Sequence, residues 1–274
     1  MTAKPPSFPP TLFVGAGRMA SAIVQGLLAT NSAHPSQLFC TCGKDPTGPD
    51  LAKRTGIQYV PEVADGLPRV DYVILACKPQ QLASLPKDLA EGSEGKLVLS
   101  ILAGIPLARL REVAPNARNI VRVMPNTPAQ IGKGISAYAT DKPLSEEDRG
   151  PVEQLLSSMG QVVQLDESHI DAVTALSGSG PAYVFEFTRL LGEAGKQLGL
   201  PEDVAALLAR QTVIGSAALL EKRAEADPVE LVREVTSPGG TTEAALKSFE
   251  GKFEEIVQRA LLAARDRSRE LSSM

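Results

Sequence analysis

The sequence predicts an α/β protein whose first domain alternates strands with helices and whose second domain is all-helical. Short apolar runs typical of buried strands recur up to Leu165, and a glycine pair follows the first of them. Beyond Leu165 these runs stop, and long apolar repeats at helical spacing replace them. We therefore predict a flexible extension over residues 1–10, an α/β domain over residues 11–166 and a helical domain over residues 167–274.

The first strand, turn and helix have the pattern of a dinucleotide-binding loop. The apolar run Leu12–Val14 predicts a buried strand, and the glycines follow it directly. Gly15 permits a turn that a side chain would block, Gly17 lets the backbone approach a pyrophosphate, and Ala20 lets the helix lie close to the strand. Free N–H groups at the helix start favour an anion. A tight turn without a ligand is the alternative, but the strand–turn–helix context favours a Rossmann-type domain.

The residues after the second predicted strand, Gln37–Cys42, bear on the choice of cofactor. Folds of this kind that select NAD commonly carry an acid there, which binds the ribose 2′-hydroxyl. Here no acid occurs before Asp45, and Lys44 could pair with the 2′-phosphate of NADP. The alternative is that Lys44 is a solvated loop residue. NADP is therefore favoured, with NADPH as the reductant and NADH possible.

The later strands of the first domain end in glycine or proline. Because Pro79 cannot extend a strand ladder, Lys78 should stand at the carboxyl end of a strand, where open α/β sheets bind ligands. Several such ends suggest one binding rim, although glycine and proline also terminate strands without any ligand. The predicted elements are a helix over Asp50–Thr55, strands over Ile57–Val60, Val70–Cys77, Lys96–Leu102 and Ile120–Met124, edge strands over Ile135–Ala139 and Val162–Leu165, and a helix from Glu146 to Met159.

Three long helices are predicted in the second domain. A helix over Pro181–Leu198 comes first, and the next, Val204–Leu220, is apolar almost all round. Since a helix without a polar face is normally buried, and the rest of the domain offers little cover, we expect a partner subunit. The last helix, Phe253–Leu271, is amphipathic. Its expected inward residues are Ile256, Val257, Ala260, Leu261 and Ala264.

Composition narrows the class of partner. With 28 basic and 32 acidic residues the net charge is -4, which gives no reason to expect nucleic acid. The 3 cysteines do not make a disulfide framework, so a reducing, cytoplasmic location is expected. No metal site is expected. No apolar run is judged long enough to cross a bilayer, so no membrane partner is expected.

Read together, these stretches resemble the pyrroline-5-carboxylate reductase family. The resemblance covers nearly the whole chain after Pro10. The glycine loop is shared by many reductases, whereas the two motifs of the second half are much more specific. The motifs that carry it are Gly15-Ala16-Gly17-Arg18-Met19, Ala76-Cys77-Lys78-Pro79-Gln80, Ser100-Ile101-Leu102-Ala103-Gly104-Ile105, Arg122-Val123-Met124-Pro125-Asn126-Thr127-Pro128, Ala175-Leu176-Ser177-Gly178-Ser179-Gly180-Pro181-Ala182-Tyr183 and Val235-Thr236-Ser237-Pro238-Gly239-Gly240-Thr241-Thr242.

The resemblance implies hydride transfer from a nicotinamide to C5 of a cyclic imine, the last step of proline biosynthesis. The substrate would be the small molecule 1-pyrroline-5-carboxylate and the product L-proline. It also implies an N-terminal Rossmann domain and a helical domain that dimerises by intertwining, giving a homodimer, alone or within a higher homo-oligomer. Together with Lys44, the motif residues make up the predicted cofactor site: Gly15, Ala16, Gly17, Arg18, Met19, Ala20, Ala76, Cys77, Lys78, Pro79, Ile101, Ala103 and Asn126.

The loop Ser237–Thr242 is the predicted substrate site. It contains no acid, and its two glycines would let successive N–H groups form an anion-binding nest. A plain helix start with a threonine N-cap is the alternative, and the resemblance favours a site for the substrate carboxylate. Ser237 and Thr242 are the catalytic candidates, with Thr242 hydrogen-bonding the ring nitrogen. The predicted substrate-binding residues are Ser237, Gly239, Gly240, Thr241, Thr242 and Glu225, although Glu225 also fits a solvated helix end.

Two other functions remain open from the residues. One is a different two-domain small-molecule reductase, such as one acting on a β-hydroxy acid, which would need a catalytic lysine in the helical domain. Lys196 is the inward candidate there. The other is a non-catalytic NADP-binding regulator, which would keep the Gly15–Ala20 loop but would not need an intact 237–242 loop.

Overall fold

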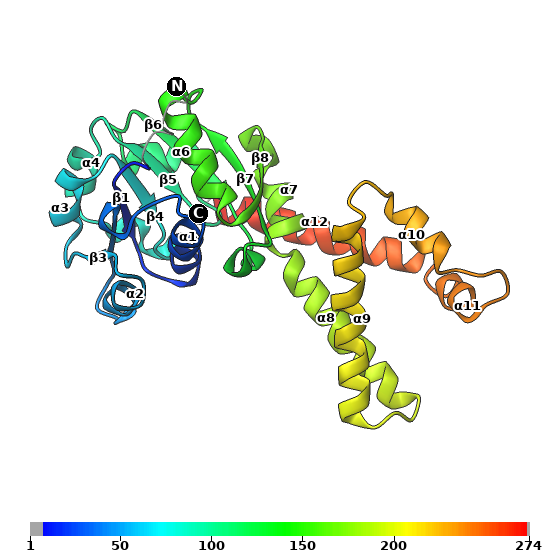
Figure 1. The fold of residues 1–274 in the computed structure, drawn as a ribbon. Helices are drawn as coiled ribbons and strands as arrows, with labels where there is room; N and C mark the ends of the chain where they lie inside the picture. Colours follow the sequence, from blue (N-terminus) through cyan, green and yellow to red (C-terminus); the bar gives the residue numbers. More distant parts are fainter. Residues whose placement is uncertain (1–7, 273–274) are drawn as a thin grey trace, which may run out of the picture. The chain divides into compact units, whose positions relative to one another are not determined.

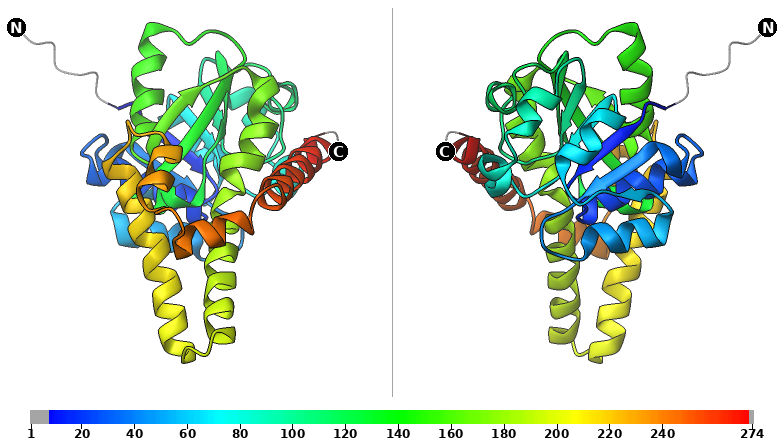
Figure 2. Two further views of the ribbon diagram at one scale, coloured as in Figure 1. Left: turned by 90° about the vertical axis from the view of Figure 1, so that its right-hand side faces the viewer. Right: turned by 90° about the vertical axis from the view of Figure 1, so that its left-hand side faces the viewer.

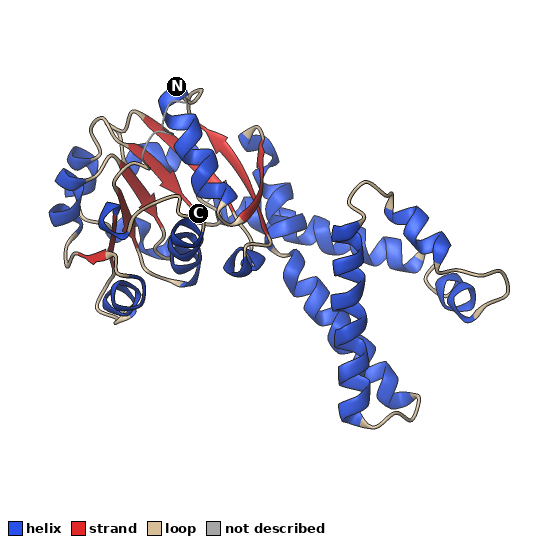
Figure 3. Cartoon of the chain, in the orientation of Figure 1, coloured by secondary structure: helices blue, strands red, loops and turns tan. Residues whose placement is uncertain are grey.

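The computed structural model describes residues 8–272 and divides the chain into two compact units (Figure 1). The first unit contains residues up to 179 and returns for residues from 264 onward, and the second contains residues 180–263. Every described strand belongs to the first unit, whereas the second consists of helices joined by loops and turns (Figure 3). The α/β class with a following helical part is therefore confirmed.

The first unit is built on an eight-stranded sheet, as far as the described residues show. The strand order is β3-β2-β1-β4-β5-β6-β7-β8, and the first six strands of that order are parallel. This is the order of a dinucleotide-binding Rossmann sheet. β7 runs antiparallel to β6, and β8 runs parallel to β7. The strands are β1 Thr11–Val14, β2 Leu38–Thr41, β3 Gln58–Tyr59, β4 Tyr72–Leu75, β5 Leu97–Ser100, β6 Asn119–Met124, β7 Gly134–Thr140 and β8 Gly160–Gln164.

Helices cover both faces of this sheet, so alternate strand residues enter two separate cores (Figure 2). Phe13 packs on one face with α1, α2 and α6, whereas Leu12 and Val14 pack on the other with α3, α4 and α5. Burial on both faces explains why the strands are continuous apolar runs. The helices are α1 Arg18–Ala29, α2 Thr47–Thr55, α3 Val63–Gly66, α4 Asp88–Gly92, α5 Leu107–Val113, α6 Glu146–Ser157 and α7 Ile170–Val173.

The second unit is led by two long antiparallel helices. α8 and α9 pack along each other, and Gly195 lies against Ala205 where they meet. Phe187 of α8 and Phe253 of α12 also have ring centroids 6.5 Å apart. The elements are α8 Gly180–Gln197, α9 Glu202–Lys222, α10 Pro228–Glu234, α11 Thr241–Lys247 and α12 Lys252–Ser272, whose last residues belong to the first unit.

Two expectations need correction. The expected flexible extension is wrong for its last residues, because Phe8 is 2% exposed in the core; residues 1–7 lie outside the described part. In α9 the buried residues among those described are Ala205 and Ala209, and the expected cover by a partner subunit stays a prediction. The inward face expected for the last helix is wrong for Ile256 and Val257, which are exposed, as is Ala260, whereas Leu261 and Ala264 are half-buried.

α9 also corrects the expectation about bilayers. It is 21 residues long, with mean hydropathy 1.3 over its most apolar window and 11% of that window buried, so by length and composition it could span a membrane. Its exposed leucines, such as Leu207 and Leu208, form an apolar face that none of the described residues covers.

Candidate active site

The β1–α1 turn brings two glycines to different environments. Gly15 has φ +112°, and a Cβ there would lie 2.5 Å from the carbonyl carbon of Ala76. The turn therefore needs glycine to approach the end of β4, as predicted. Gly17 is the N-cap of α1, and a Cβ there would meet no atom within 4 Å. No side chain caps α1 and no acid stands in its first turn, so its N–H groups are available to an anion.

A cleft of about 610 Å³ opens at this turn. It is lined by Gly15, Ala16 and Gly17 on one side and by Ala76, Cys77 and Lys78 on another. These two stretches meet because β1 and β4 are neighbours, with the Ala76 N–H donating to the Val14 carbonyl at 2.9 Å. A cleft at the carboxyl ends of adjacent parallel strands is the usual ligand site of such a sheet.

The remaining predicted cofactor residues lie outside the lining of this cleft. Arg18 lines a neighbouring cleft between α1 and α2, together with Lys53 and Arg54. Lys44 is exposed and does not line either cleft, although Gly43 and Asp45 beside it line the first. Met19 is half-buried and Ala20 fully buried against the core, Pro79 begins the 3-10 helix after β4, and Ile101 and Ala103 follow β5.

The side chain of Asn126 hydrogen-bonds to two other segments of the described chain. Its side-chain oxygen accepts a hydrogen bond from the Ile135 N–H at 3.0 Å, and its side-chain nitrogen donates to the Ser177 carbonyl at 3.2 Å. The carboxamide thereby links the segment after β6 to β7 and to the π-helical turn Thr174–Gly178 before α8. Its predicted cofactor contact stays a prediction.

Cys77 lines the cleft, and its thiol is neutral. Burial raises the pKa of Cys77 above its ordinary value. Because only a thiolate is a strong nucleophile, this residue is a poor covalent catalyst at neutral pH. The cleft therefore offers an anion-binding turn and a cation at Lys78 rather than a covalent nucleophile.

The predicted substrate loop, Ser237–Thr242, lies in the second unit. Gly240 is the N-cap of α11 with no side-chain cap, so the threonine N-cap considered above is wrong. Gly239 has φ +73°, and its N–H donates to the Glu243 carboxylate at 3.0 Å. The loop itself lacks an acid, but the next residue places a carboxylate on one of the N–H groups expected for the substrate. Ser237 and Thr241 are exposed and Thr242 is half-buried.

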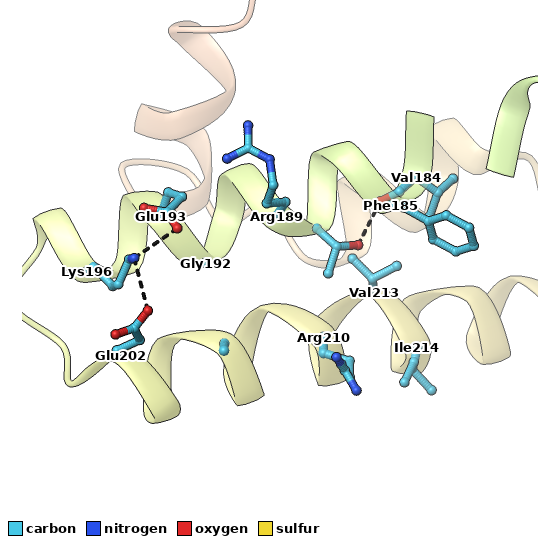
Figure 4. A pocket seen from close by; sticks show the side chains of 12 residues that line it. Val184, Phe185, Arg189, Gly192, Glu193, Lys196, Glu202, Arg210, Val213 and Ile214 are labelled. Carbon is cyan, nitrogen blue, oxygen red and sulfur yellow. Dashed lines mark hydrogen bonds and ion pairs between the residues drawn. The ribbon is translucent and has the colours of Figure 1, made fainter. Parts of the chain in front are cut away.

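The other candidates of the second unit lie apart in sequence from this loop. Glu225 is exposed in the turn between α9 and α10. Lys196 lies 2.9 Å from Glu193 and 3.5 Å from Glu202, at one end of a groove between α8 and α9 (Figure 4). A hydrogen bond to Glu193 raises the pKa of Lys196, which keeps it charged and paired. This arrangement does not favour the catalytic lysine that a β-hydroxy-acid reductase would need.

Sequence reasoning overlooked the acidic wall of the first cleft. Asp45, Thr47 and Glu62 line it, and α2 begins at Thr47, three residues before the predicted start. The sequence Asp-Pro-Thr could have revealed this, because an Asp followed by Pro is a typical helix start. Among the described residues, no group of three or more His, Cys, Asp or Glu side chains is placed to hold a metal ion.

Two family models match the chain. Residues 167–271 match pyrroline-5-carboxylate reductase dimerisation, and residues 11–104 match NADP oxidoreductase coenzyme F420-dependent. The first model covers the helical part and the second covers the glycine turn and strands β1 to β5.

Relatives match over nearly the full length. A pyrroline-5-carboxylate reductase from Pseudomonas aeruginosa is 41% identical, in an alignment that covers 97% of this chain and 98% of the relative. One from Arabidopsis thaliana is 37% identical, and that alignment covers 95% of this chain and 94% of the relative. The solved structure of such a reductase from Coxiella burnetii has a TM-score of 0.89 at 34% identity, covering 97% of this chain and 99% of that one. The Plasmodium falciparum enzyme, solved with NADP bound, has a TM-score of 0.82 at 30% identity, covering 97% and 99%. The chain therefore belongs to the pyrroline-5-carboxylate reductase family, as its motifs predict.

Proposed function

We propose that this chain reduces 1-pyrroline-5-carboxylate to L-proline with NADPH, or with NADH, as a cytoplasmic enzyme of proline biosynthesis. The observation that carries the proposal is the uncapped start of α1, which opens onto the cleft formed with Ala76–Lys78. Family membership supports the same reaction. The nicotinamide supplies the hydride, and the protein supplies position and charge. The two other functions considered above, a different two-domain reductase and a regulator, are not favoured.

The predicted residues would act at two places. The N–H groups of the Gly15–Ala20 turn would hold the pyrophosphate, with Lys78 as a nearby cation. The Ser237–Thr242 loop would hold the substrate carboxylate, and Thr242 would hydrogen-bond the ring nitrogen. Because Glu243 accepts from the Gly239 N–H, substrate binding at that N–H would require Glu243 to withdraw, and Lys247 lies 3.4 Å from it as an alternative partner.

The activity itself is the first test. Purified protein given pyrroline-5-carboxylate should oxidise NADPH, followed by absorbance, and chromatography should detect L-proline. The same assay is carried out in parallel with NADH in place of NADPH. Protein that is folded but forms no proline above background with either nucleotide would contradict the proposed reaction.

Thr242→Ala should lower turnover more than it weakens NADPH binding. The hydrogen bond to the ring nitrogen changes strength as the iminium becomes an amine, and losing a bond to a charged group costs ~1.5–3 kcal/mol. Turnover should therefore fall roughly ten- to a hundredfold. Ser237→Ala should mainly raise the Michaelis constant, if its hydroxyl holds the carboxylate equally in ground and transition states. Steady-state kinetics on both variants, with circular dichroism as a fold control, decides; wild-type kinetics for Thr242→Ala would remove that residue from the mechanism.

We further propose that the chain is a homodimer, alone or within a larger homo-oligomer, and that a second subunit rather than lipid covers α9. The exposed leucines of α9 and the match to a dimerisation domain support this. Light scattering at micromolar concentration should give at least twice the chain mass of 28.9 kDa. Leu207→Glu should reduce that mass, because Leu207 is 65% exposed in one chain and would be tolerated in a monomer. A stable wild-type monomer is the contrary result.

A further inference from the structure

The loop after β2 forms a charged wall of the first cleft. In a Rossmann sheet the adenosine ribose lies at the carboxyl end of the strand beside the glycine turn, which here is β2. The charged residues that line the cleft near this strand are Asp45 and Glu62, both acidic, whereas the exposed Lys44 does not line it. The cation that does line it, Lys78, follows β4 instead.

The Asp45 carboxylate is held in place by the start of α2. Its Oδ1 accepts a hydrogen bond from the Thr47 N–H at 3.0 Å and another from the Thr47 hydroxyl. The bond from the Thr47 hydroxyl, which has the larger effect, and the bond from the Thr47 N–H both lower the pKa of Asp45. The carboxyl group is therefore an anion at neutral pH. Its Oδ2 lies 4.0 Å from the position that a Cβ on Gly43 would occupy, and both Gly43 and Asp45 line the cleft.

We propose that Asp45 sets the relative affinity of the chain for NADH and NADPH. Its carboxylate accepts a hydrogen bond from a ribose 2′-hydroxyl, as in NADH, and repels the 2′-phosphate of NADPH. This rests on the proposed function, because it assumes that the cleft holds a nicotinamide dinucleotide. The chain would therefore bind NADH alongside NADPH, because an acid lines the cleft beyond the end of β2, where the ribose of a bound dinucleotide would lie.

The test is the ratio of dissociation constants for NADPH and NADH, measured by fluorescence titration of the full chain. Asp45→Asn removes the charge and keeps an oxygen for Thr47. The ratio of the NADPH to the NADH dissociation constant should fall roughly tenfold or more, because NADPH would then bind relatively more tightly. This is the scale expected from removing the repulsion between charges about 4 Å apart near a protein surface. The matched control is Asp65→Asn, which removes an exposed acid of α3 that does not line the cleft. An unchanged ratio in Asp45→Asn, or an equal change in the control, overturns the proposal.

Wild-type protein gives a second measurement that does not depend on a variant folding. Raising the salt concentration screens charges, so net repulsion of the 2′-phosphate predicts that the NADPH-to-NADH ratio falls as salt rises. If the ratio of the NADPH to the NADH dissociation constant rises with salt, the 2′-phosphate is attracted by a cation rather than repelled by an acid. This outcome overturns the role of Asp45. Wild-type protein that binds neither nucleotide contradicts the proposed function instead, so the two failures are distinguishable.

Discussion

Gly17→Val is expected to weaken NADPH binding by roughly a hundredfold or more while the fold survives. A valine would occupy the space where the pyrophosphate meets the start of α1, and each hydrogen bond lost to that charged group costs ~1.5–3 kcal/mol. The chain itself tolerates the change, because a Cβ on Gly17 meets no atom within 4 Å and φ is -70°. Fluorescence titration gives the affinity, and circular dichroism confirms the fold.

Two other glycines make this prediction selective. Gly150→Val adds the same side chain to α6, where a Cβ again meets nothing within 4 Å, so its NADPH affinity should equal that of the wild type. Gly15→Val should instead damage the fold, because φ is +112° and a Cβ would lie 2.5 Å from the carbonyl oxygen of Ala76. Retained NADPH affinity in Gly17→Val would show that the turn is structural only.

Asp148→Ala is expected to lower the free energy of unfolding of the first unit by about 3 kcal/mol. Asp148 is a nearly buried carboxylate on α6 whose Oδ1 accepts from the Tyr72 hydroxyl at 2.9 Å and from Arg118 at 2.6 Å. Removing one partner of a buried ion pair typically costs ~3–5 kcal/mol. The lower end applies because the Arg118 side chain is 35% exposed and can reach water. Urea unfolding followed by circular dichroism measures the change.

The effect of Asp148 should also depend on pH. Burial raises the pKa of Asp148, but the hydrogen bonds from Arg118 and Tyr72 outweigh it and leave the pKa below its ordinary value. A carboxyl whose pKa is lowered on folding stabilises the fold above the unfolded value of about 3.9, and this stabilisation is lost as pH falls through the folded value. The gap between wild type and Asp148→Ala should therefore be full at pH 7 and shrink below about pH 4.

A surface pair supplies the control for Asp148. Glu112 pairs with Arg109 on α5, but their side chains are 62% and 52% exposed. Exposed pairs contribute about 0–1 kcal/mol, so Glu112→Ala should leave the urea midpoint nearly unchanged. Equal destabilisation by the two substitutions would mean that the Asp148 network adds nothing beyond a surface contact.

The sequence by itself determined the class of fold and the family, because both depend on features that neighbouring residues specify. Strand, turn and helix at Leu12–Leu27 are specified by neighbouring residues, because apolar periodicity and a glycine with positive φ are local properties. The order of motifs from the Gly15 loop to the Ser237 loop identified the family for the same reason. The strand pattern likewise located Lys78 just beyond the end of β4, where it lines the cleft.

The tertiary structure decided what depends on neighbours distant in sequence. The strand order that joins Gly15 to Ala76, and the antiparallel placement of β7, follow from packing across the whole sheet. Asp45 rather than Lys44 lines the cleft, and the Thr47 N–H donates a hydrogen bond to its carboxylate at the start of α2, a contact that charge alone does not reveal. The apolar pattern of α9 predicted burial against a partner subunit, and among the described residues only Ala205 and Ala209 of this helix are buried within the chain. The apolar periodicity of a sequence predicts which residues become buried. Which surface buries them is decided only by the packing of the folded and assembled chains.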